Sequence, residues 1–457
     1  MAVGKNTIDM TQGPLFFNIL RFCVPLTLSF LLQLAFNAAD MMVIGRWGNA
    51  QSLAAIGAST FILTLMTNAI TGLSTGANML AAQYFGARDS QRMTRLVHTT
   101  IALSIAGGVA CGVLGLILVK WLVEITDVPE AVRDKSILYL SICFLGIPFQ
   151  ILYNFGYAIL RAIGNTKSPL YYLIYSGIVN VLLNLFMVVV CKTDVAGVAI
   201  ATVVSQMLSA WLITRRLQKN HGSTRLYWKN LRLHPVPLKN ILHLGIPAAV
   251  QSACFSLSNI VVQAGINSFG VAAVAGLTGG YYLELLLYSI VFAIHHSAIA
   301  VIGQNYGAKK YKRVIKTIYI VFAIAFGATL TFGWLLYLVS PKMMCLFSSD
   351  PEVIHFGVLR AAAMFTVYFL LGFMDTSSGV LRGLGNSVYP AVASLAGTVG
   401  FRILWMKFAF PYIGTLESVM AVYPISWGLV AACNIIVMII LCRKLLLPHI
   451  RRSALTV

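Results

Sequence analysis

The stretch from Phe22 to Ile44, FCVPLTLSFLLQLAFNAADMMVI, decides the fold because it is a bilayer-length apolar run with one carboxylate near its end. A hydrocarbon core of roughly 30 Å needs about 20 residues of apolar helix. Asp40 then lies inside the membrane, where an Asp costs about 2.5–3.5 kcal/mol on insertion scales. An acid retained there marks a candidate functional site. The alternative interpretation is that Asp40 snorkels toward the helix end or forms a structural pair.

Two amides share a helical face with this carboxylate. Gln33, Asn37 and Asp40 follow one another at spacings of four and three residues, which places them on one side of a helix. The pattern predicts that this side faces a polar cavity. Pro25, earlier in the same run, removes a backbone hydrogen bond and allows a bend.

The composition is that of a polytopic membrane protein. Of 457 residues, 59% are hydrophobic and 10% charged, and the mean hydropathy is +0.84. The net charge of +20 is better explained by basic cytoplasmic loops than by a nucleic-acid partner, which we do not expect. The N-terminus has no small-residue cleavage site, so the first span should stay in the membrane. The eight cysteines have no C-x-x-C spacing, and we expect no metal, no disulfide and no cofactor.

Apolar runs separated by short polar stretches predict an all-α protein with about 12 transmembrane helices. The runs are 16–44, 53–83, 97–121, 137–160, 170–191, 196–214, 241–267, 272–303, 317–339, 356–381, 388–410 and 419–442. Alternate connections differ in charge. Basic residues cluster in 88–95, 161–167, 215–239, 309–316 and 443–452, and acidic residues in 124–134, 194, 350–352 and 417. This bias predicts a plasma (inner) membrane protein with both termini in the cytoplasm.

The chain contains an internal duplication. LRAIGNTKSP at 160–169 recurs as LRGLGNSVYP at 381–390, and QYFGARDSQR at 83–92 recurs as QNYGAKKYKR at 304–313, both at an offset of 221 residues. The Gly-Asn and Gly-Ala turns in these segments are interpreted as helix C-caps.

The duplication predicts two six-helix bundles, 1–214 and 241–457, joined by a cytoplasmic linker, 215–240. Six spans per half give parallel repeats, an arrangement typical of transporters with a site at the repeat interface.

The sequence resembles the multidrug and toxic compound extrusion (MATE) family, and within it the DinF-like prokaryotic branch. The resemblance is carried by the N-terminal GPLFFNILRFCVPLTLSFLLQLAFNAADMMVIGRWG, the LAAIGA that follows, the twin LR-x-x-GN elements, and G-x-x-N-x-x-x-N at Gly177, Asn180 and Asn184. It covers the chain from about Thr11 to Arg443. It implies a MATE or MOP-type fold and cation-coupled multidrug export of amphiphilic, often cationic compounds by an antiporter, which we expect to be a monomer.

The resemblance also implies a cation-coupling site in the first bundle. Asp40 matches the carboxylate of the first helix, Asn180 the Asn of the fifth, and Thr202 the Thr of the sixth. The family often has a second carboxylate one turn after the Asn, where this chain has Asn184. Sodium prefers several hard oxygen ligands, whereas a lone carboxylate can carry a proton, so we favour H+ over Na+ as the coupling ion.

Further candidates for the substrate cavity come from spacing. The second bundle has a polar stripe at Ser252, Ser256, Asn259, Gln263 and Asn267. The repeat, whose offset is 222 residues in this helix, places Val262 opposite Asp40. Glu284 shares a stripe with Tyr281 and Tyr288, where a carboxylate beside aromatic rings could attract a lipophilic cation. The candidates for the cavity are Gln33, Asn37, Asn259, Gln263, Tyr281, Glu284, Tyr288 and Asp375.

For several polar residues the sequence leaves alternatives open. Asp375 aligns with Asn154, and the NorM-like branch uses an acid on this helix, but pairing of Asp375 with Arg382 is the alternative. His295 and His296 are either satisfied polar contacts or proton carriers. Polar residues of spans five and six can also serve as interhelical glue.

Two other functions are weighed against multidrug export. A lipid-linked oligosaccharide or lipid flippase would need several cationic residues in the cavity, and only Arg402 and Lys407 are candidates on the eleventh span. A membrane-embedded enzyme would need clustered His, Asp or Cys residues at catalytic spacing, and the sequence has none. We therefore expect a transporter and not an enzyme.

Overall fold

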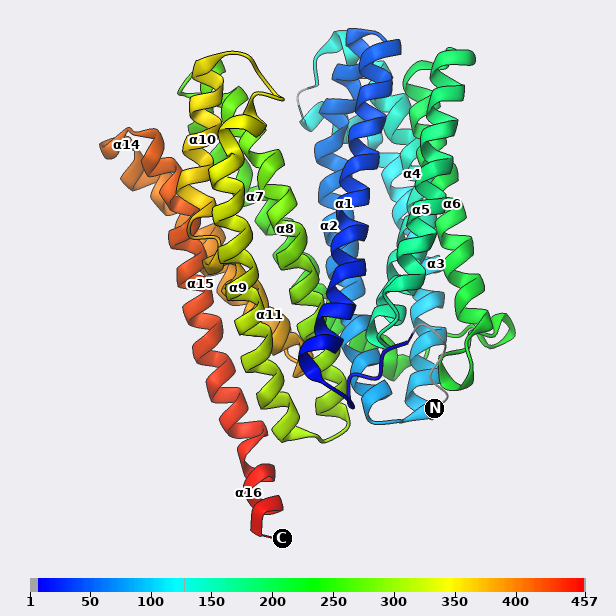
Figure 1. Ribbon diagram of the computed structural model, residues 1–457. Helices are drawn as coiled ribbons and strands as arrows, with labels where there is room; N and C mark the ends of the chain where they lie inside the picture. The colour runs from blue at the N-terminus through cyan, green and yellow to red at the C-terminus, as the bar shows by residue number, and fades with distance from the viewer. Residues whose placement is uncertain (1–6, 127, 456–457) are drawn as a thin grey trace. The chain divides into compact units, whose positions relative to one another are not determined.

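The computed structural model describes the backbone of residues 7–126 and 128–455, nearly all of it helical (Figure 1). The helices of the first half are α1 (Leu15–Trp47), α2 (Ala50–Gly86), α3 (Ser90–Ile125), α4 (Glu130–Ala162), α5 (Lys167–Leu185), the π-helix η1 (Phe186–Val190) and α6 (Asp194–Lys219). The second half begins with α7 (Pro235–Asn267), α8 (Val271–Gly307), α9 (Tyr311–Met344), α10 (Pro351–Phe365) and α11 (Phe369–Gly383). It ends with α12 (Val388–Ser394), π-helix η4 (Leu395–Gly400), α13 (Phe401–Leu404), π-helix η5 (Trp405–Ala409), α14 (Phe410–Ile413), α15 (Leu416–Leu445) and α16 (Leu447–Leu455).

Eleven helices in the described chain are long and apolar enough to cross a membrane, and the pair α10 and α11 makes a twelfth span bent by 50°. The count agrees with the prediction, but the run 356–381 is not one continuous helix. At the break, Val367 and Tyr368 donate to carbonyls three residues earlier, at 3.3 and 3.4 Å. The Thr366 hydroxyl also donates to the Ala362 carbonyl at 2.8 Å. These tighter bonds replace the α-helical ladder and turn the chain.

The chain forms two compact units that exchange the beginnings of two helices. Unit 1 contains Met1–Asp9 and Leu28–Ile246, and unit 2 contains Met10–Thr27 and Pro247–Val457. Helix α1 therefore starts in unit 2 and continues in unit 1, and α7 does the reverse. Both divisions lie within two residues of a proline, Pro25 or Pro247. The predicted domain boundaries at 214 and 241 stay a prediction.

Unit 1 is organised around α4, which packs against α2, α3 and α6. Small residues bring the helices close. A Cβ at Gly108 of α3 would lie 2.8 Å from the Cα of Pro148 on α4, and one at Gly112 would lie 2.9 Å from the Phe144 carbonyl oxygen. Close approach through glycines is the usual packing of membrane helices, where lipid provides no hydrophobic drive between them.

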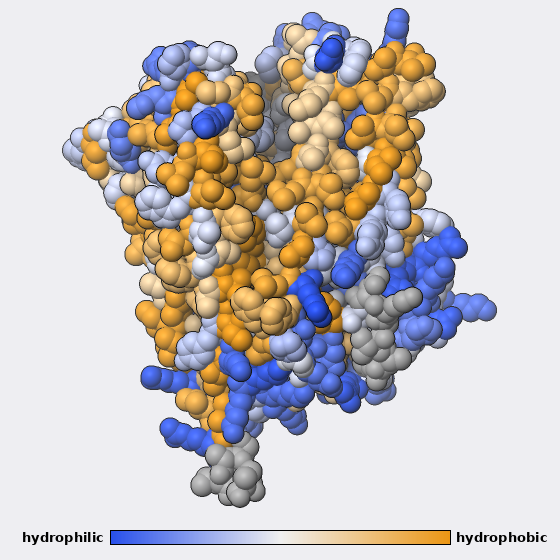
Figure 2. All heavy atoms as spheres, viewed as in Figure 1, coloured by the Kyte–Doolittle hydropathy of each residue, from blue (hydrophilic) through white to orange (hydrophobic). Residues whose placement is uncertain are grey.

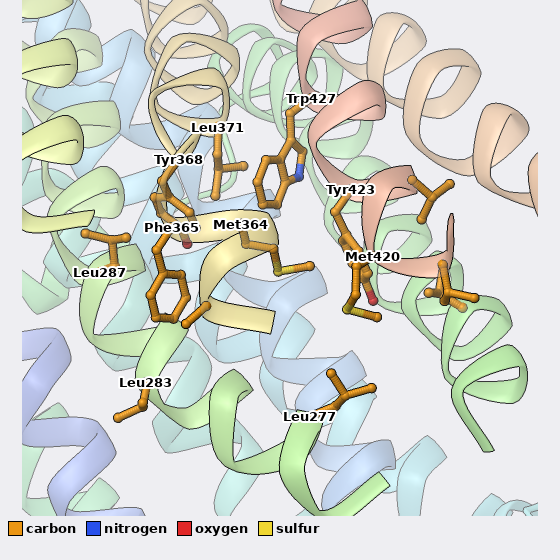
Figure 3. Close-up of a cluster of buried hydrophobic side chains, with 14 of the residues drawn as sticks. Leu277, Leu283, Leu287, Met364, Phe365, Tyr368, Leu371, Met420, Tyr423 and Trp427 are labelled. Carbon is orange, nitrogen blue, oxygen red and sulfur yellow. The ribbon is translucent and has the colours of Figure 1, made fainter. Parts of the chain in front are cut away.

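In unit 2, α8 packs against α9, α10 and α11, and α11 packs against α15. A buried cluster fills the space between α8, the α10–α11 break and α15 (Figure 3). The Tyr368 ring, at the break, meets the Trp427 ring of α15 edge to face at 5.6 Å between centroids. Aromatic pairs of this kind add about 0.5–1.5 kcal/mol beyond the area they bury, so the bend is fixed by the core.

The twin turns of the duplication are helix C-caps, as predicted. Gly164 and Gly385 have positive φ values of 82° and 90°, and the Asn that follows each accepts a backbone N–H of the next helix. In the Gly-Ala turns the left-handed residue is Arg88 or Lys309, with φ of 54° and 57°. Matching turn geometry at both copies shows that the duplication extends to the backbone.

The connection between α6 and α7 is shorter than residues 215–240, because α6 continues to Lys219 and α7 begins at Pro235. Proline fits the first turn of a helix, where its missing N–H costs nothing. The connection packs on the first turns of α3. The Tyr227 N–H donates to His98 Nε2 at 3.1 Å, and the His234 N–H donates to Thr99 Oγ1 at 3.2 Å.

Hydrophobic side chains cover the middle of the helices, and hydrophilic side chains gather at their ends (Figure 2). This distribution is the one that a bilayer imposes on a bundle of spanning helices.

Candidate functional site

The carboxylate of Asp40 is held by an amide from another helix. The Nδ2 atom of Asn184, on α5, donates to Asp40 Oδ1, on α1. Asn184 is fully buried and Asp40 is half-buried. Asn184 Oδ1 has no hydrogen-bond partner among the described residues. The acid therefore makes a polar contact with a neighbouring helix of unit 1.

A glycine one turn before Asn180 allows α5 to approach α1. A Cβ at Gly177 would overlap the ring of Phe36 on α1. Gly177 and Asn184 are seven residues apart, two helical turns, so they lie on the same side of α5. The G-x-x-N-x-x-x-N motif thus combines a close-packing residue with the amide that contacts the carboxylate.

The other predicted members of the coupling site do not touch Asp40 through a described hydrogen bond. Asn180 is buried, and its Oδ1 atom lacks a hydrogen-bond partner within the described chain. The Thr202 hydroxyl donates to the Val198 carbonyl of its own helix at 2.9 Å. Gln33 and Asn37 are exposed on α1, on the helical face that they share with Asp40.

Two residues near Asp40 were missed from the sequence. Tyr139 and Cys143 of α4 lie close enough to the carboxylate to interact with it electrostatically, and their side chains share a hydrogen bond. Both are buried, at 8% and 7% exposure. They are one turn apart in an apolar span, and nothing in their spacing relates them to a carboxylate on another helix.

In unit 2, Glu284 of α8 forms an ion pair, and its predicted role in the substrate cavity stays a prediction. Its Oε2 atom accepts from Nη2 and Nε of Arg360 on α10, at 2.7 and 3.2 Å. The Arg360 guanidinium also lies 5.5 Å from the centre of the Tyr281 ring. Arg360 is not among the residues predicted from the sequence, although an Arg inside an apolar span is itself a signal.

The polar stripe of α7 is reached by a second arginine. Arg402, on α13, donates from Nη1 to Asn259 Oδ1 at 2.8 Å and from Nε to the Ser426 hydroxyl at 3.1 Å. Further along α7, Gln263 Nε2 donates to Asn267 Oδ1 at 3.0 Å. Asn259 therefore belongs to a group of buried polar contacts, whereas Gln263 is exposed and bonded along its own helix.

His295 of α8 interacts with the backbone carbonyl of Asp375 on α11. His295 Nδ1 is 2.7 Å from the Asp375 carbonyl oxygen, and Arg382 Nη1 is 3.2 Å from His295 Nε2. Because a guanidinium can only donate, Nε2 accepts and Nδ1 carries the hydrogen, so His295 is the neutral tautomer. Arg382 Nη2 also donates to Gln251 Oε1 at 2.7 Å.

The pairing of Asp375 with Arg382 takes the form of an electrostatic interaction, without an ion-pair contact within 4.0 Å among the described residues. Tyr288 interacts electrostatically with both Asp375 and Tyr281.

A cavity of about 330 Å³ lies elsewhere in unit 2, between the start of α8 and the α9–α10 connection. Thr278, Tyr282 and Phe347 are among the residues that line it, and none of the predicted site residues does. Within residues 7–126 and 128–455, no three His, Cys, Asp or Glu side chains are grouped as metal ligands.

The family model MatE matches the chain twice, at residues 25–186 and 247–405. The two matches begin at Pro25 and Pro247, as the duplication requires. The chain belongs to the MatE family. Members of this family are transporters, so the protein is a multi-pass membrane transporter and not an enzyme.

Relatives and solved structures of the MatE family agree with this assignment. The chain is 28% identical over 394 residues to the probable multidrug resistance protein YoeA of Bacillus subtilis, covering 84% of each protein. It is 26% identical over 407 residues to the probable multidrug resistance protein YpnP of the same organism, covering 88% and 89%. A solved MOP superfamily transporter from Pyrococcus furiosus superposes with a TM-score of 0.88 at 19% identity, covering 97% and 99%. The predicted family and fold class are confirmed, and the assignment to the DinF-like branch stays a prediction.

Proposed function

We propose that this MatE protein is a secondary active multidrug exporter of the plasma membrane, with both termini in the cytoplasm, in which Asp40 exchanges a proton for an amphiphilic, often cationic substrate. The observation that carries the proposal is the contact between Asp40 and Asn184. The names of the relatives YoeA and YpnP support multidrug compounds as the substrate class.

A proton is favoured over sodium as the coupling ion because the hydrogen-bond partner of Asp40 is a neutral amide and not a second carboxylate. A sodium ion needs several hard oxygen ligands, and only one carboxylate among the described residues belongs to this contact. Protonation needs no further ligand. It removes the negative charge, so the carboxyl group loses its charge-assisted hydrogen bond from Asn184.

The proposed cycle links this loss of charge to α1. Protonation from outside neutralises Asp40, the contact with α5 weakens, and α1 repacks near Pro25, where its hydrogen-bond ladder is interrupted. A cationic substrate then loses its counter-charge and leaves. An inward-directed membrane potential favours entry of the coupling cation by about 2.3 kcal/mol per charge per 100 mV.

The test is substrate efflux from proteoliposomes under a pH gradient and a sodium gradient, imposed separately. We expect the pH gradient alone to drive efflux, and Asp40→Asn to abolish it while leaving membrane insertion intact. Asp134→Asn is the matched control, because it removes an exposed carboxylate from the same unit. Efflux driven only by sodium would overturn the choice of ion. Undiminished efflux in Asp40→Asn would overturn the assignment of the site.

A further inference from the structure

A row of charged and aromatic side chains crosses unit 2 from Glu284 to Arg402. Arg360 binds Glu284, and its guanidinium lies 5.6 Å from the centre of the Tyr423 ring. Arg402 lies 4.5 Å from the same ring. Tyr423, which Figure 3 shows on α15 beside Met420, therefore has two guanidinium groups close to its ring. Like charges this close in a membrane-spanning bundle require a compensating anion nearby.

The carboxylates of the row do not balance the guanidiniums. Three arginines of the described part of unit 2 are buried, namely Arg360, Arg382 and Arg402. The acids that interact with them within the spans are Glu284 and Asp375. The buried part of the unit therefore carries one positive charge in excess. An uncompensated buried charge is strongly unfavourable, so the excess marks a place for an anion.

Arg402 is the guanidinium whose charge is left over. It is fully buried, and its two hydrogen-bond acceptors, Asn259 and Ser426, are both neutral. Its Nη2 atom has no hydrogen-bond partner among the described residues. A planar guanidinium with a free donor matches the oxygens of a carboxylate or a phosphate.

The backbone around Arg402 is irregular. Arg402 lies on α13, a four-residue α-helical segment between the π-helices η4 and η5. Single π-helical turns inside α-helices are frequent at functional sites, because each one re-aims a side chain. This observation is independent of the charge balance.

Aromatic rings cover the same guanidinium. The centre of the Phe255 ring, on α7, lies 5.3 Å from the guanidinium carbon of Arg402. The Tyr423 ring is the second aromatic neighbour of this guanidinium. At the other end of the row, Tyr281 packs on Arg360 and is 44% exposed, which brings the row to the surface of the unit. Because Arg402 is fully buried, binding at Nη2 requires side chains around it to move. The rings then remain as neighbours for a flat, apolar scaffold.

We propose that unit 2 holds a binding site for the anionic group of an aromatic compound, a carboxylate or a phosphate, with Arg402 as its principal donor. Comparison of the two repeats indicates that this site is specific to unit 2. At the offset of 221, Arg360 corresponds to Tyr139 and Glu284 to Leu63, so unit 1 has no equivalent charged row. The inference rests on the proposed export function and adds anionic aromatic compounds to its substrates.

Binding is measured with purified full-length protein in nanodiscs of phosphatidylcholine, by fluorescence titration with 1-pyrenebutanoate. The methyl ester of the same compound is the neutral probe. We expect the acid to bind at least tenfold more tightly than the ester, and Arg402→Gln to remove that preference. Lys407→Gln is the matched control, since it removes an exposed positive charge five residues away. Arg402→Lys, which keeps the charge but not the fork of donors, should retain part of the preference and guards against misfolding.

Equal binding of acid and ester, or an equal loss of affinity in Lys407→Gln, would overturn the proposal. The source of the anion is tested by repeating the titration in nanodiscs that contain phosphatidylglycerol. Competition by this lipid supports the site with a lipid phosphate as its occupant, and lack of competition supports a soluble aromatic anion. Asp40→Asn should bind 1-pyrenebutanoate normally, so failure of the anion site and failure of the coupling site give different results.

Discussion

Asn184 of α5 donates a hydrogen bond to the carboxylate of Asp40 on α1. The neutral amide satisfies one oxygen of the carboxylate without adding a negative charge. Under the proposed mechanism, we therefore expect the residue at position 184 to influence which coupling ion unit 1 carries.

We predict that Asn184→Asp shifts coupling toward sodium. Two carboxylates in contact repel each other, and a cation with several oxygen ligands relieves the repulsion. Efflux from proteoliposomes should gain a sodium-driven component that the unmodified protein lacks. Asn184→Leu, which removes the hydrogen bond without adding charge, should show no such component. A sodium response in the leucine variant would contradict the explanation.

Gly177→Ala should destabilise unit 1 by about 1–3 kcal/mol, because the added Cβ meets the Phe36 ring and overpacking costs this much. Thermal unfolding in detergent measures the effect, and Phe36→Leu in the same chain should restore part of the loss. Gly107→Ala is the control. Nothing lies within 4 Å of a Cβ there, so it should be neutral or stabilising by up to about 1 kcal/mol. Equal losses at both glycines would show that the contact with Phe36 is unimportant.

For the buried ion pair of Glu284 and Arg360, we predict which partner is more important for stability. Their side chains are 13% and 6% exposed, and removing one partner of such a pair costs about 3–5 kcal/mol. Glu284→Gln should be the more harmful change, since it leaves Arg360 and Arg402 without a nearby carboxylate to offset their charges. Arg360→Gln leaves Glu284 with Arg402 nearby. Thermal unfolding of both variants and of the double variant tests this order.

The control for that pair is Asp89→Asn, which breaks the exposed contact with Arg92, 70% exposed at its side chain. An ion pair of this kind is worth about 0–1 kcal/mol. Asp89 also caps α3, and because Asn caps a helix about as well as Asp, the cap should be retained and the total loss should stay small. Arg360→Gln that proved more harmful than Glu284→Gln would contradict the excess of positive charge.

Acidification should loosen residues 220–234 from α3. Partial burial lowers the pKa of His234, with further lowering by Arg95, Arg232 and His98. A lowered pKa means that the docked state binds fewer protons than the undocked one, so docking is favoured at high pH and weakens as pH falls through the usual histidine range, about 6.5 and below.

Hydrogen exchange at the Tyr227 amide, compared at pH 7.5 and 5.5 after correction for intrinsic rates, measures this docking. Protection should fall at the lower pH. His98→Asn should reduce protection at both values, whereas His221→Gln, at an exposed site, should change neither. Protection that is independent of pH would contradict the prediction.

Much of the fold follows from local sequence. Apolar runs of bilayer length gave the helices, and the repeat at 221 residues gave the matching turns at Gly164 and Gly385, because helix ends are fixed by nearby residues. The break between α10 and α11 was not foreseen. At the break, Tyr368 packs against Trp427, 59 residues away in the sequence, and no local breaker such as proline marks it.

The candidate site divides in the same way. Asp40 was recognisable because an acid in an apolar span is rare, and the resemblance to a family pointed to α5. The pairing of Glu284 with Arg360 was not recognisable, because it joins α8 and α10 and no spacing rule relates residues on different spans. Intramembrane charges can thus be found from sequence, but their partners require the packed helices.

The exchange of helix beginnings has a consequence for biosynthesis. Unit 1 lacks its last segment until Ile246 has left the ribosome, and residues Met10–Thr27, made at the outset, remain without their neighbours until unit 2 follows. Each unit therefore includes a segment that is encoded in the other half of the sequence. During insertion, the beginning of α1 is therefore made long before the residues of unit 2 with which it packs. The two copies of the duplication thus depend on each other while the chain is still being synthesised.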